Sequence, residues 1–415
     1  MEDVFISNIK INKVRHLENL EIPLSDTERK HLILTGKNGS GKTSVLLALK
    51  NLISELENSK KNRLETFFGK LSDYEKQLKR ADFLLSAENN GGRDLLLEKK
   101  RDLEKAFEDH LNLENIYFLF DSIDGFYNLF DEGNYVFAFF PSKRIAEFKL
   151  PSGPKKLDVK SHYSIEEKAN LGFMQYMANL RFSYLNAVFN QEGEVASTID
   201  DWTDKFVDCL KQIFDAPNLK LHFDSENFKY DIFLDNKDKF DLSTLSDGFS
   251  RAIDIVSELM MRMEKNSSRF YEVQGIVLID EIETHLHIDL QKKILPFLTS
   301  FFPKIQFIVT THSPFVLTSL NDAVIYDLES QEPIDDLSGY SVEAIIEGYF
   351  GADKYSQALK SKVDEYELLA KKDELSFSEE KRFKSLKKYF DDLSDVFAEE
   401  LKLKIQQIRL LNPVK

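Results

Sequence analysis

An α/β fold with an open parallel sheet is predicted for this chain of 415 residues, on three apolar segments. In "HLILTGKNGSGKTSVLLALK", residues 31–50, an apolar strand leads through a glycine-rich turn into an apolar helix. "IVLID", residues 276–280, begins with a continuous apolar run, as strands buried in parallel sheets do, and it ends in an acid. "KIQFIVTTH", residues 304–312, is a third apolar strand, and it ends in polar residues. Open α/β sheets place ligands at the carboxyl ends of their strands, so we expect the site there.

Composition indicates a globular protein, because 42% of the residues are hydrophobic and 34 are Phe. The single cysteine, Cys209, argues against a disulfide framework and a cysteine-based zinc site. The net charge of -16 argues against a broadly basic nucleic-acid binder but leaves a local basic groove open. The segment "MEDVFISNIK" lacks the features of a signal peptide, and no apolar run approaches the roughly 20 residues of a membrane helix. We therefore expect a soluble, cytoplasmic protein with no membrane partner.

The turn after the first apolar strand fits the phosphate-binding pattern G-x-x-x-x-G-K-[ST]. In this pattern glycines let backbone N–H groups surround the phosphates of ATP, and the helix N-terminus adds its positive end. Lys42 is expected to reach the β- and γ-phosphates, and the Thr43 hydroxyl to bind Mg²⁺. The alternative is a glycine-rich turn that fits by chance. The expected nucleotide-binding residues in this turn are Gly36, Lys37, Asn38, Gly39, Ser40, Gly41, Lys42, Thr43 and Ser44.

Two acids at the end of the 276–280 strand are expected to have different roles. Asp280 is predicted to hold Mg²⁺, and Glu281 to take a proton from the attacking water. The alternative for Glu281 is an acid at the start of a helix. His285 and His287 are two residues apart, which does not put them on one helical face, so we favour contacts at a subunit interface over zinc binding.

Two further segments carry weaker signals. Ser246 and Gly248 lie just before an amphipathic helix, where a serine serves either as an N-cap or as part of an anion site. His312 follows the strand of residues 304–310, where it can reach a γ-phosphate or simply bond to the backbone. The presence of the glycine-rich turn and the acid pair favours the nucleotide-binding interpretation of both.

These four motifs, in this order, resemble ABC-class ATPases of the branch that includes SMC, RecF and OLD proteins. Within the branch, "IDEIETHLH" followed by "FIVTTHSPFVL" is similar to ATPases of bacterial anti-phage defence modules, of the Septu type and its retron-associated versions. The segments that carry the resemblance are residues 36–43, 245–249, 279–287 and 311–314.

The resemblance implies roles residue by residue. Lys42 and Thr43 would bind phosphate and Mg²⁺, with Asp280 supporting the metal. Glu281 would be the general base and His312 the sensor of the γ-phosphate. Ser246 and Gly248 would contact the ATP of a second subunit, which implies a head-to-tail homodimer or a higher oligomer.

The sequence also departs from the family pattern. Asp247 and Phe249 stand where transporter cassettes have Gly and Gln, which argues against a transporter. No glutamine typical of the Q-loop is evident, and Ser142, Lys143 or Arg144 are candidates to line the nucleotide site in its place. Arg15 or His16 is a candidate to face the adenine.

Four regions are expected. Residues 1–50 form the first part of the ATPase head and residues 51–115 a helical, coiled-coil hairpin about 35–40 Å long at 1.5 Å per residue. Residues 116–330 complete the head, and residues 331–415 form a helical region that binds a partner. The hairpin is short and has no C-x-x-C, so tethering of distant DNA ends is not expected.

The resulting hypothesis is an ATPase subunit of an anti-phage system that controls a separately encoded effector, a nuclease in our interpretation. The chain has no D-x-D at a strand end and no H-N-H constellation, so no nuclease centre of its own is expected. One alternative is a RecF- or SMC-like ATPase of DNA repair or recombination, with nucleic acid as a partner. Another is an assembly scaffold with little ATP turnover.

Overall fold

The computed structural model forms two compact units, residues 1–340 and 341–415. It describes residues 3–58, 64–87, 93–111, 115–144, 148–149, 151, 153, 155, 157–234, 238–242, 245, 247–264, 273–334, 337, 339–351, 355–372, 374–392 and 399–411. Each unit is described by itself below. None of the helices in these ranges is both long and apolar enough to cross a membrane.

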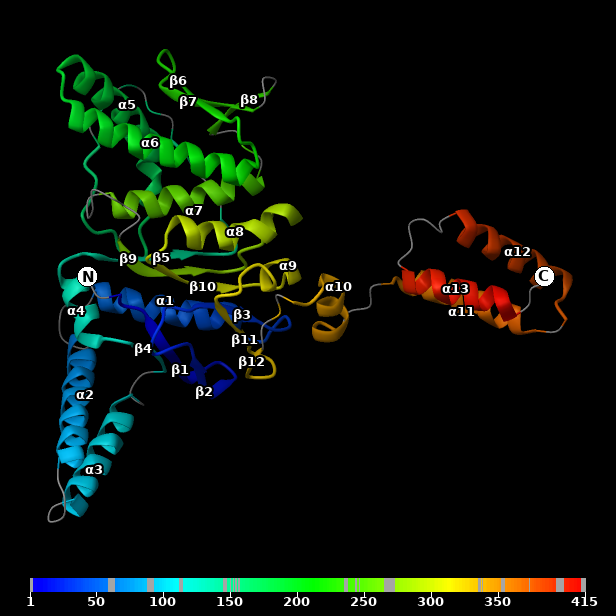
Figure 1. Ribbon diagram of the computed structural model, residues 1–415, viewed down its shortest axis with the longest axis horizontal. Helices are drawn as coiled ribbons and strands as arrows, with labels where there is room; N and C mark the ends of the chain where they lie inside the picture. Colours follow the sequence, from blue (N-terminus) through cyan, green and yellow to red (C-terminus); the bar gives the residue numbers. More distant parts are fainter. Residues whose placement is uncertain are drawn as a thin grey trace. The chain divides into compact units, whose positions relative to one another are not determined.

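A six-stranded sheet in the order β12-β11-β3-β10-β9-β5 forms the centre of the first unit (Figure 1). Five strands are parallel, and β12 pairs antiparallel with β11 at the edge. All residues of β9 and β10 are buried, which explains their continuous apolar sequences. The strands are β3 (His31–Thr35), β5 (Tyr135–Phe140), β9 (Gln274–Ile279), β10 (Ile305–Thr310), β11 (Ala323–Asp327) and β12 (Glu332–Ile334). The parallel α/β sheet expected from the sequence is confirmed.

A second sheet, antiparallel and in the order β2-β1-β4, shares one core with the first. Its strands are β1 (Ile6–Val14), β2 (Leu17–Pro23) and β4 (Ile116–Phe120). Helix α1 (Lys42–Asn58) packs between the two sheets, and its buried residues Val45, Leu49 and Ile53 belong to that core. Because α1 is held on both sides, the glycine-rich turn that precedes it is fixed against the central sheet.

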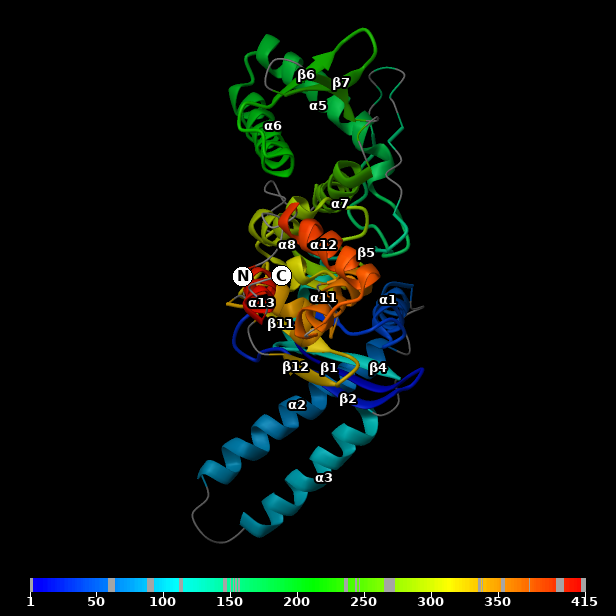
Figure 2. The same ribbon diagram turned by 90° about the vertical axis from the view of Figure 1, so that its right-hand side faces the viewer.

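The remaining elements of the first unit lie around these sheets (Figures 1 and 2). Helix α7 (Asp247–Met263) packs against β5, and α8 (Ile288–Phe301) packs against β10. The sheet β6-β7-β8 is antiparallel, with β7 as its central strand. The other elements are α4 (Ile123–Asp131), η1 (Asn170–Gly172), α5 (Phe173–Phe189), α6 (Gly193–Phe214), β6 (Lys220–Asp224), β7 (Lys229–Leu234), β8 (Asp238–Asp241) and α9 (Pro314–Leu317).

Two helices, α2 (Leu64–Ala87) and α3 (Arg93–Leu111), run side by side between α1 and β4 in the sequence (Figures 1 and 2). Tyr74 and Phe107 meet edge to face at 6.3 Å, and Lys100 pairs with Asp82 at 2.6 Å. At about 1.5 Å per residue, the 24 residues of α2 span about 36 Å.

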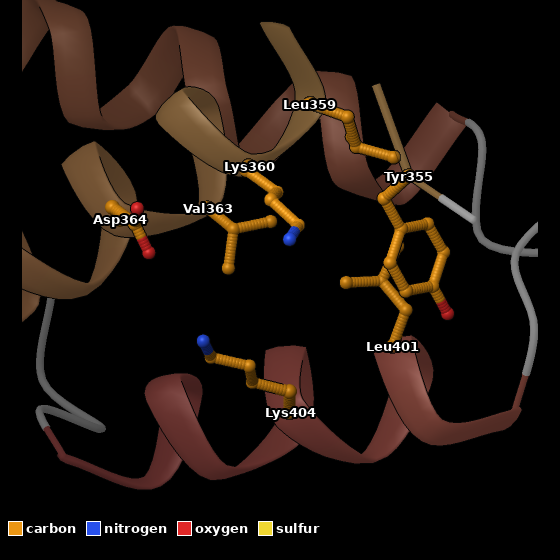
Figure 3. A pocket seen from close by; sticks show the side chains of 7 residues that line it. All are labelled: Tyr355, Leu359, Lys360, Val363, Asp364, Leu401 and Lys404. Carbon is orange, nitrogen blue, oxygen red and sulfur yellow. The ribbon is translucent and has the colours of Figure 1, made fainter. Parts of the chain in front are cut away.

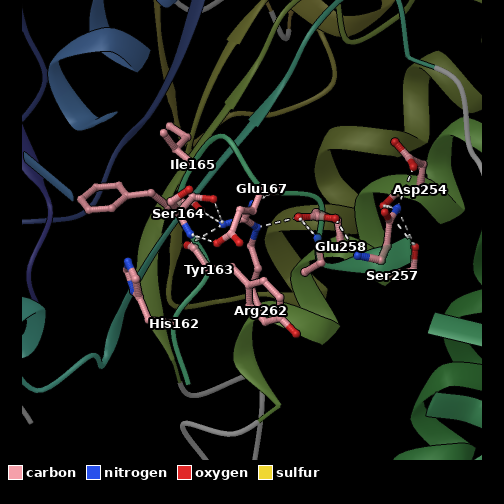
Figure 4. Close-up of polar contacts among 12 residues, drawn as sticks. His162, Tyr163, Ser164, Ile165, Glu167, Asp254, Ser257, Glu258 and Arg262 are labelled. Carbon is pink, nitrogen blue, oxygen red and sulfur yellow. Dashed lines mark hydrogen bonds and ion pairs between the residues drawn. The ribbon is translucent and has the colours of Figure 1, made fainter. Parts of the chain in front are cut away.

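A buried polar network joins α7 to residues 162–170 (Figure 4). The Arg262 side chain is 3% exposed; its Nε donates to Glu258 Oε1 at 2.7 Å, and its Nη1 to the carbonyls of Phe137 at 2.7 Å and Tyr163 at 3.0 Å. Glu258 in turn accepts from the backbone N–H of Asn170 at 2.9 Å. With its partners satisfied, this network ties α7 rigidly to the preceding segment.

The second unit is helical, with a core between three helices. Ser376 and Glu379 form a reciprocal cap at the start of α12, with Ser376 N 2.9 Å from Glu379 Oε2. A cavity of about 420 Å³ lies between α11 and α13, and the amino groups of Lys360 and Lys404 point into it (Figure 3). The elements are α10 (Val342–Ala344), the π-helical turn η4 (Ile345–Tyr349), α11 (Gln357–Lys371), α12 (Phe377–Asp392) and α13 (Glu399–Leu411).

Candidate active site

The glycine-rich turn connects β3 to α1 with backbone angles that favour glycine. Gly36, Gly39 and Gly41 have φ of +129°, +91° and +102°. A Cβ on Gly36 would lie 2.8 Å from both Asp327 Oδ1 and Ser40 Oγ, which is too close for any side chain. The turn is therefore specified by sterics as well as by conformation.

Lys42 lies across this turn. Its side chain is buried, and Nζ donates to the carbonyls of Gly36 at 2.7 Å and Lys37 at 3.0 Å, with Ser40 Oγ at 3.4 Å. Burial lowers the pKa of Lys42, and the nearby carboxylate of Glu281 acts against that shift. The ammonium is thus held at the centre of the loop by neutral acceptors, where an anion can bind to it.

A cavity of about 210 Å³ opens beside Lys42. It brings together side chains that follow β3 and β9 and the end of β10. Residues that line it are Arg15, Asn38, Gly39, Gly41, Lys42, Thr43, Ser44, Glu281 and His312. Three other residues expected in the turn do not line the cavity. Gly36, Lys37 and Ser40 instead provide the acceptors for Lys42.

Asp280 is buried at the end of β9 and faces Thr43. Thr43 Oγ1 lies 3.1 Å from both carboxylate oxygens of Asp280. The hydroxyl of Thr310 donates to Asp280 Oδ1 at 2.7 Å and accepts from the N–H of Glu281 at 2.7 Å. A hydroxyl and a carboxylate oxygen are ligands that suit Mg²⁺, which uses few protein ligands together with phosphates and water. The residues therefore fit the expected metal.

Glu281 adopts a left-handed backbone conformation with φ of +46°, which is uncommon outside glycine. Its side chain lines the cavity, and its Oε2 accepts from Thr284 Oγ1 at 3.1 Å. The alternative of an acid at the start of a helix is wrong, because α8 begins only at Ile288. The strained turn instead directs the carboxylate toward the glycine-rich turn.

Glu283, which was not among the residues predicted from the sequence, connects the ends of two neighbouring strands. Its carboxylate accepts from Thr311 Oγ1 at 2.8 Å and from the backbone N–H of His312 at 2.6 Å. Burial lowers the pKa of His312, and Lys42 adds to the effect, so this imidazole is neutral near pH 7. The available signal was a third acid after β9 together with the hydroxyls that end β10.

Arg144 also has a position that the sequence did not indicate. It does not line the 210 Å³ cavity; its guanidinium donates to backbone carbonyls of residues 280–282. Ser142 contributes a carbonyl that accepts from Arg251 Nη1 at 3.2 Å, and Lys143 lines a different pocket. Arg15 does line the cavity, and a Cβ on Gly41 would lie 3.5 Å from His16 Cε1.

The start of α7 does not contribute to this cavity within the described part of the chain. Gly248 packs against the segment after Glu281, where a Cβ would lie 3.0 Å from the carbonyl oxygen of His285. Ser246 lies outside the described residues. His285 and His287 are exposed. Across the described ranges, no group of three or more His, Cys, Asp or Glu side chains is placed to hold a metal ion.

The parallel sheet and the glycine-rich turn between β3 and α1 are those of a P-loop ATPase. The chain belongs to the family described as "AAA domain, putative AbiEii toxin, Type IV TA system", whose model matches residues 32–318.

Curated relatives of this chain include Septu proteins and retron ATPases. The chain is 39% identical over 137 residues to the Septu protein PtuA of Bacillus mycoides (strain KBAB4), which is 31% of this chain and 19% of that protein. It is 29% identical over 234 residues to the retron Ec83 probable ATPase of Escherichia coli, which is 54% of this chain and 41% of that protein. The chain thus spans less than half the length of these curated relatives.

Among solved structures, the chain is similar to an SMC head bound to the C-winged helix domain of ScpA. The TM-score is 0.39 at 14% sequence identity, over 78% of this chain and 94% of that one.

Proposed function

We propose that the chain binds and hydrolyses ATP with Mg²⁺ and acts as the ATPase subunit of a bacterial anti-phage defence system. The observation that carries the proposal is the contact between Thr43 and Asp280, next to a cavity that Lys42, Glu281 and His312 share. The similarity to Septu and retron proteins supports the defence context.

Each residue of the cavity has a chemical task in this proposal. Lys42 releases its backbone acceptors and binds the phosphates, and the N–H groups of the turn add further donors. Bound Mg²⁺ would supply positive charge against the β- and γ-phosphates, held by Thr43 and Asp280. Glu281 accepts a proton from the attacking water, and neutral His312 donates a hydrogen bond to the γ-phosphate.

We also propose that two chains share their sites head to tail. Helix α7 has 17 residues and an N-terminus that is absent from the nucleotide cavity of its own chain. A helix N-terminus favours an anion, so Ser246 and Gly248 gain a ligand if they cap ATP held by a second chain. The same patch on both chains closes the assembly as a two-fold dimer.

A mixing experiment tests the shared sites. Lys42→Ala chains and Ser246→Arg chains are each expected to be inactive. A mixed dimer has one site with both defects and one with neither, so mixing should restore part of the activity. If mixed dimers form and activity stays absent, the shared-site proposal is wrong.

The effector in this proposal is a separately encoded nuclease, and the unit of residues 341–415 is its binding region. That unit has its own core and a lysine-lined cavity, and none of its described residues belongs to the nucleotide cavity. The double charge reversal Lys360→Glu with Lys404→Glu should prevent co-purification of the neighbouring gene product while ATP hydrolysis is retained. Unchanged co-purification would argue for another docking region.

Phosphate release by the purified chain tests the activity. We expect turnover that needs Mg²⁺ and is lost in Asp280→Asn. Phage plating on cells that carry the native locus, with and without Asp280→Asn, tests the defence role. ATP turnover without any effect of the locus on phage plating would support the ATPase activity and contradict the defence role.

A further inference from the structure

Arg144 is an arginine with almost no exposed surface, four residues after β5 ends. Its side chain is 3% exposed. Nη1 donates to the carbonyl oxygen of Asp280 at 3.1 Å, and Nη2 donates to those of Glu281 and Ile282, both at 3.3 Å. One guanidinium therefore donates to three consecutive carbonyls in the turn that follows β9.

These carbonyls belong to a turn without regular structure, and the turn is strained. Glu281 has φ of +46°, an angle that a non-glycine residue seldom adopts without support from its surroundings. On the N–H side, Asp280 bonds to the carbonyl of Phe140 at 2.8 Å and Ile282 to that of Thr310 at 3.1 Å. On the carbonyl side, Arg144 donates to all three oxygens, and the Thr284 N–H also donates to the carbonyl of Glu281 at 3.0 Å. The carbonyls of Asp280 and Ile282 therefore depend most on Arg144. Buried carbonyls left unpaired would destabilise this conformation relative to others.

Keeping a guanidinium here costs free energy. Burial lowers the pKa of Arg144 to about 10, and the neighbouring Arg251 acts in the same direction. A planar group with five N–H donors in a rigid fork holds several backbone oxygens in one fixed arrangement, whereas the three donors of a lysine ammonium rotate freely. The role of this side chain thus follows from its hydrogen bonds to the turn, and its positive charge is a cost of placing them there.

We propose that Arg144 is a positioning residue, which holds the backbone of residues 280–282 so that the Glu281 carboxylate points into the nucleotide cavity. The inference rests on the proposed ATPase function and adds to it a residue that acts through Glu281. Arg144 does not line the 210 Å³ cavity itself. It lines a neighbouring cavity of about 270 Å³, together with Lys50, Glu166 and Asp254.

The test compares two arginines of equal burial. Arg262 is also 3% exposed and also donates to several carbonyls, but none of them belongs to residues 280–282. Arg144→Lys should lower kcat by about 10- to 100-fold, the scale of a slightly misplaced catalytic group. Its Kd for a labelled ATP analogue should stay within about twofold of wild type. Arg262→Lys should lower Tm but leave kcat of the folded protein near wild type.

Chemical rescue provides a second readout. The cavity of about 270 Å³ beside Arg144 gives a small cation room to enter. Guanidinium chloride at low millimolar concentration should therefore restore part of the kcat of Arg144→Ala, whereas sodium chloride should not. If Arg144→Ala does not fold, the comparison of Arg144→Lys with Arg262→Lys still decides.

The outcomes separate this inference from the proposed function. A wild-type chain that releases no phosphate overturns the ATPase proposal and this inference with it. Wild-type turnover with unchanged kcat in Arg144→Lys overturns only the positioning role. A parallel loss of affinity would mean that Arg144 binds the nucleotide, and an equal kcat loss in Arg262→Lys would mean general destabilisation. Either result contradicts the inference.

Discussion

Thr43 and Asp280 are 237 residues apart in the chain, yet the Thr43 hydroxyl lies 3.1 Å from both oxygens of the Asp280 carboxylate. The contact exists because β3 and β9 flank β10 in one parallel sheet and end at the same edge. Helix α1 starts at Lys42, directly after the turn that follows β3. The sheet therefore brings the phosphate-binding turn to the acids that follow β9.

Glu281→Gln should bind ATP and hydrolyse it about 10²- to 10⁴-fold more slowly than wild type, since a glutamine cannot take the proton from water. Steady-state phosphate release and bound nucleotide should be measured on the same sample. Normal hydrolysis by this variant would mean that another group activates the water.

Gly36→Ala should destabilise the chain more than Gly39→Ala. Both positions have positive φ, which costs about 1–3 kcal/mol for a non-glycine residue. Only Gly36 is also crowded, with Asp327 Oδ1 and Ser40 Oγ 2.8 Å from the added Cβ, whereas nothing lies within 4 Å of a Cβ at Gly39. The crowding adds about 1–3 kcal/mol. Thermal unfolding without nucleotide measures the difference, and equal Tm values for the two variants would contradict it.

Glu283→Ala should reduce kcat by about tenfold or more, because the half-buried N–H of His312 loses its acceptor and the residue loses its fixed position. Glu283→Gln is the matched control. Its amide oxygen can still accept from His312 N–H, and its NH₂ can donate to Thr311 Oγ1, so most activity should remain. If the glutamine variant is as inactive as the alanine variant, the charge of Glu283 matters and the hydrogen bonds do not.

Stability should depend on pH through Glu57. Its side chain is 1% exposed, and its Oε2 accepts from the N–H of Ile165 at 2.6 Å. Burial raises the pKa of Glu57 from 4.5 to about 7 in the folded chain, with Glu166 and Glu167 adding to the shift, while the Ile165 N–H and Arg262 oppose it. The folded state therefore binds the proton more tightly than the unfolded state does.

The direction of the effect follows from that difference. Protonation of Glu57 stabilises the folded state, and this stabilisation is fully present below pH 4.5. It is lost as the pH rises to about 7. Glu57→Gln does not ionise, so its stability relative to wild type should increase by about 3 kcal/mol between pH 4.5 and pH 8. Urea unfolding of both chains at the two pH values measures this. A constant difference would contradict the raised pKa.

The sequence predicted the parts of the site that depend on local pattern. Glycines at a strand-to-helix turn and an acid at the end of an apolar strand are short-range signals, so Lys42, Thr43 and Asp280 could be named. Which strands are neighbours is a long-range property, and the contacts of Glu283 and Arg144 depend on it. Both residues act on backbone atoms of another segment, and no residue pattern encodes such a contact.

Binding of a labelled ATP analogue with Mg²⁺, compared between wild type and Lys42→Ala, decides whether the cavity beside Lys42 is the nucleotide site. Lys42 places a buried ammonium at the centre of the glycine-rich turn, beside the cavity that Glu281 and His312 line. We expect saturable binding by wild type and none by Lys42→Ala, with thermal unfolding as the check that the variant is folded. Equal affinity in the two folded chains would contradict the assignment of this cavity as the nucleotide site.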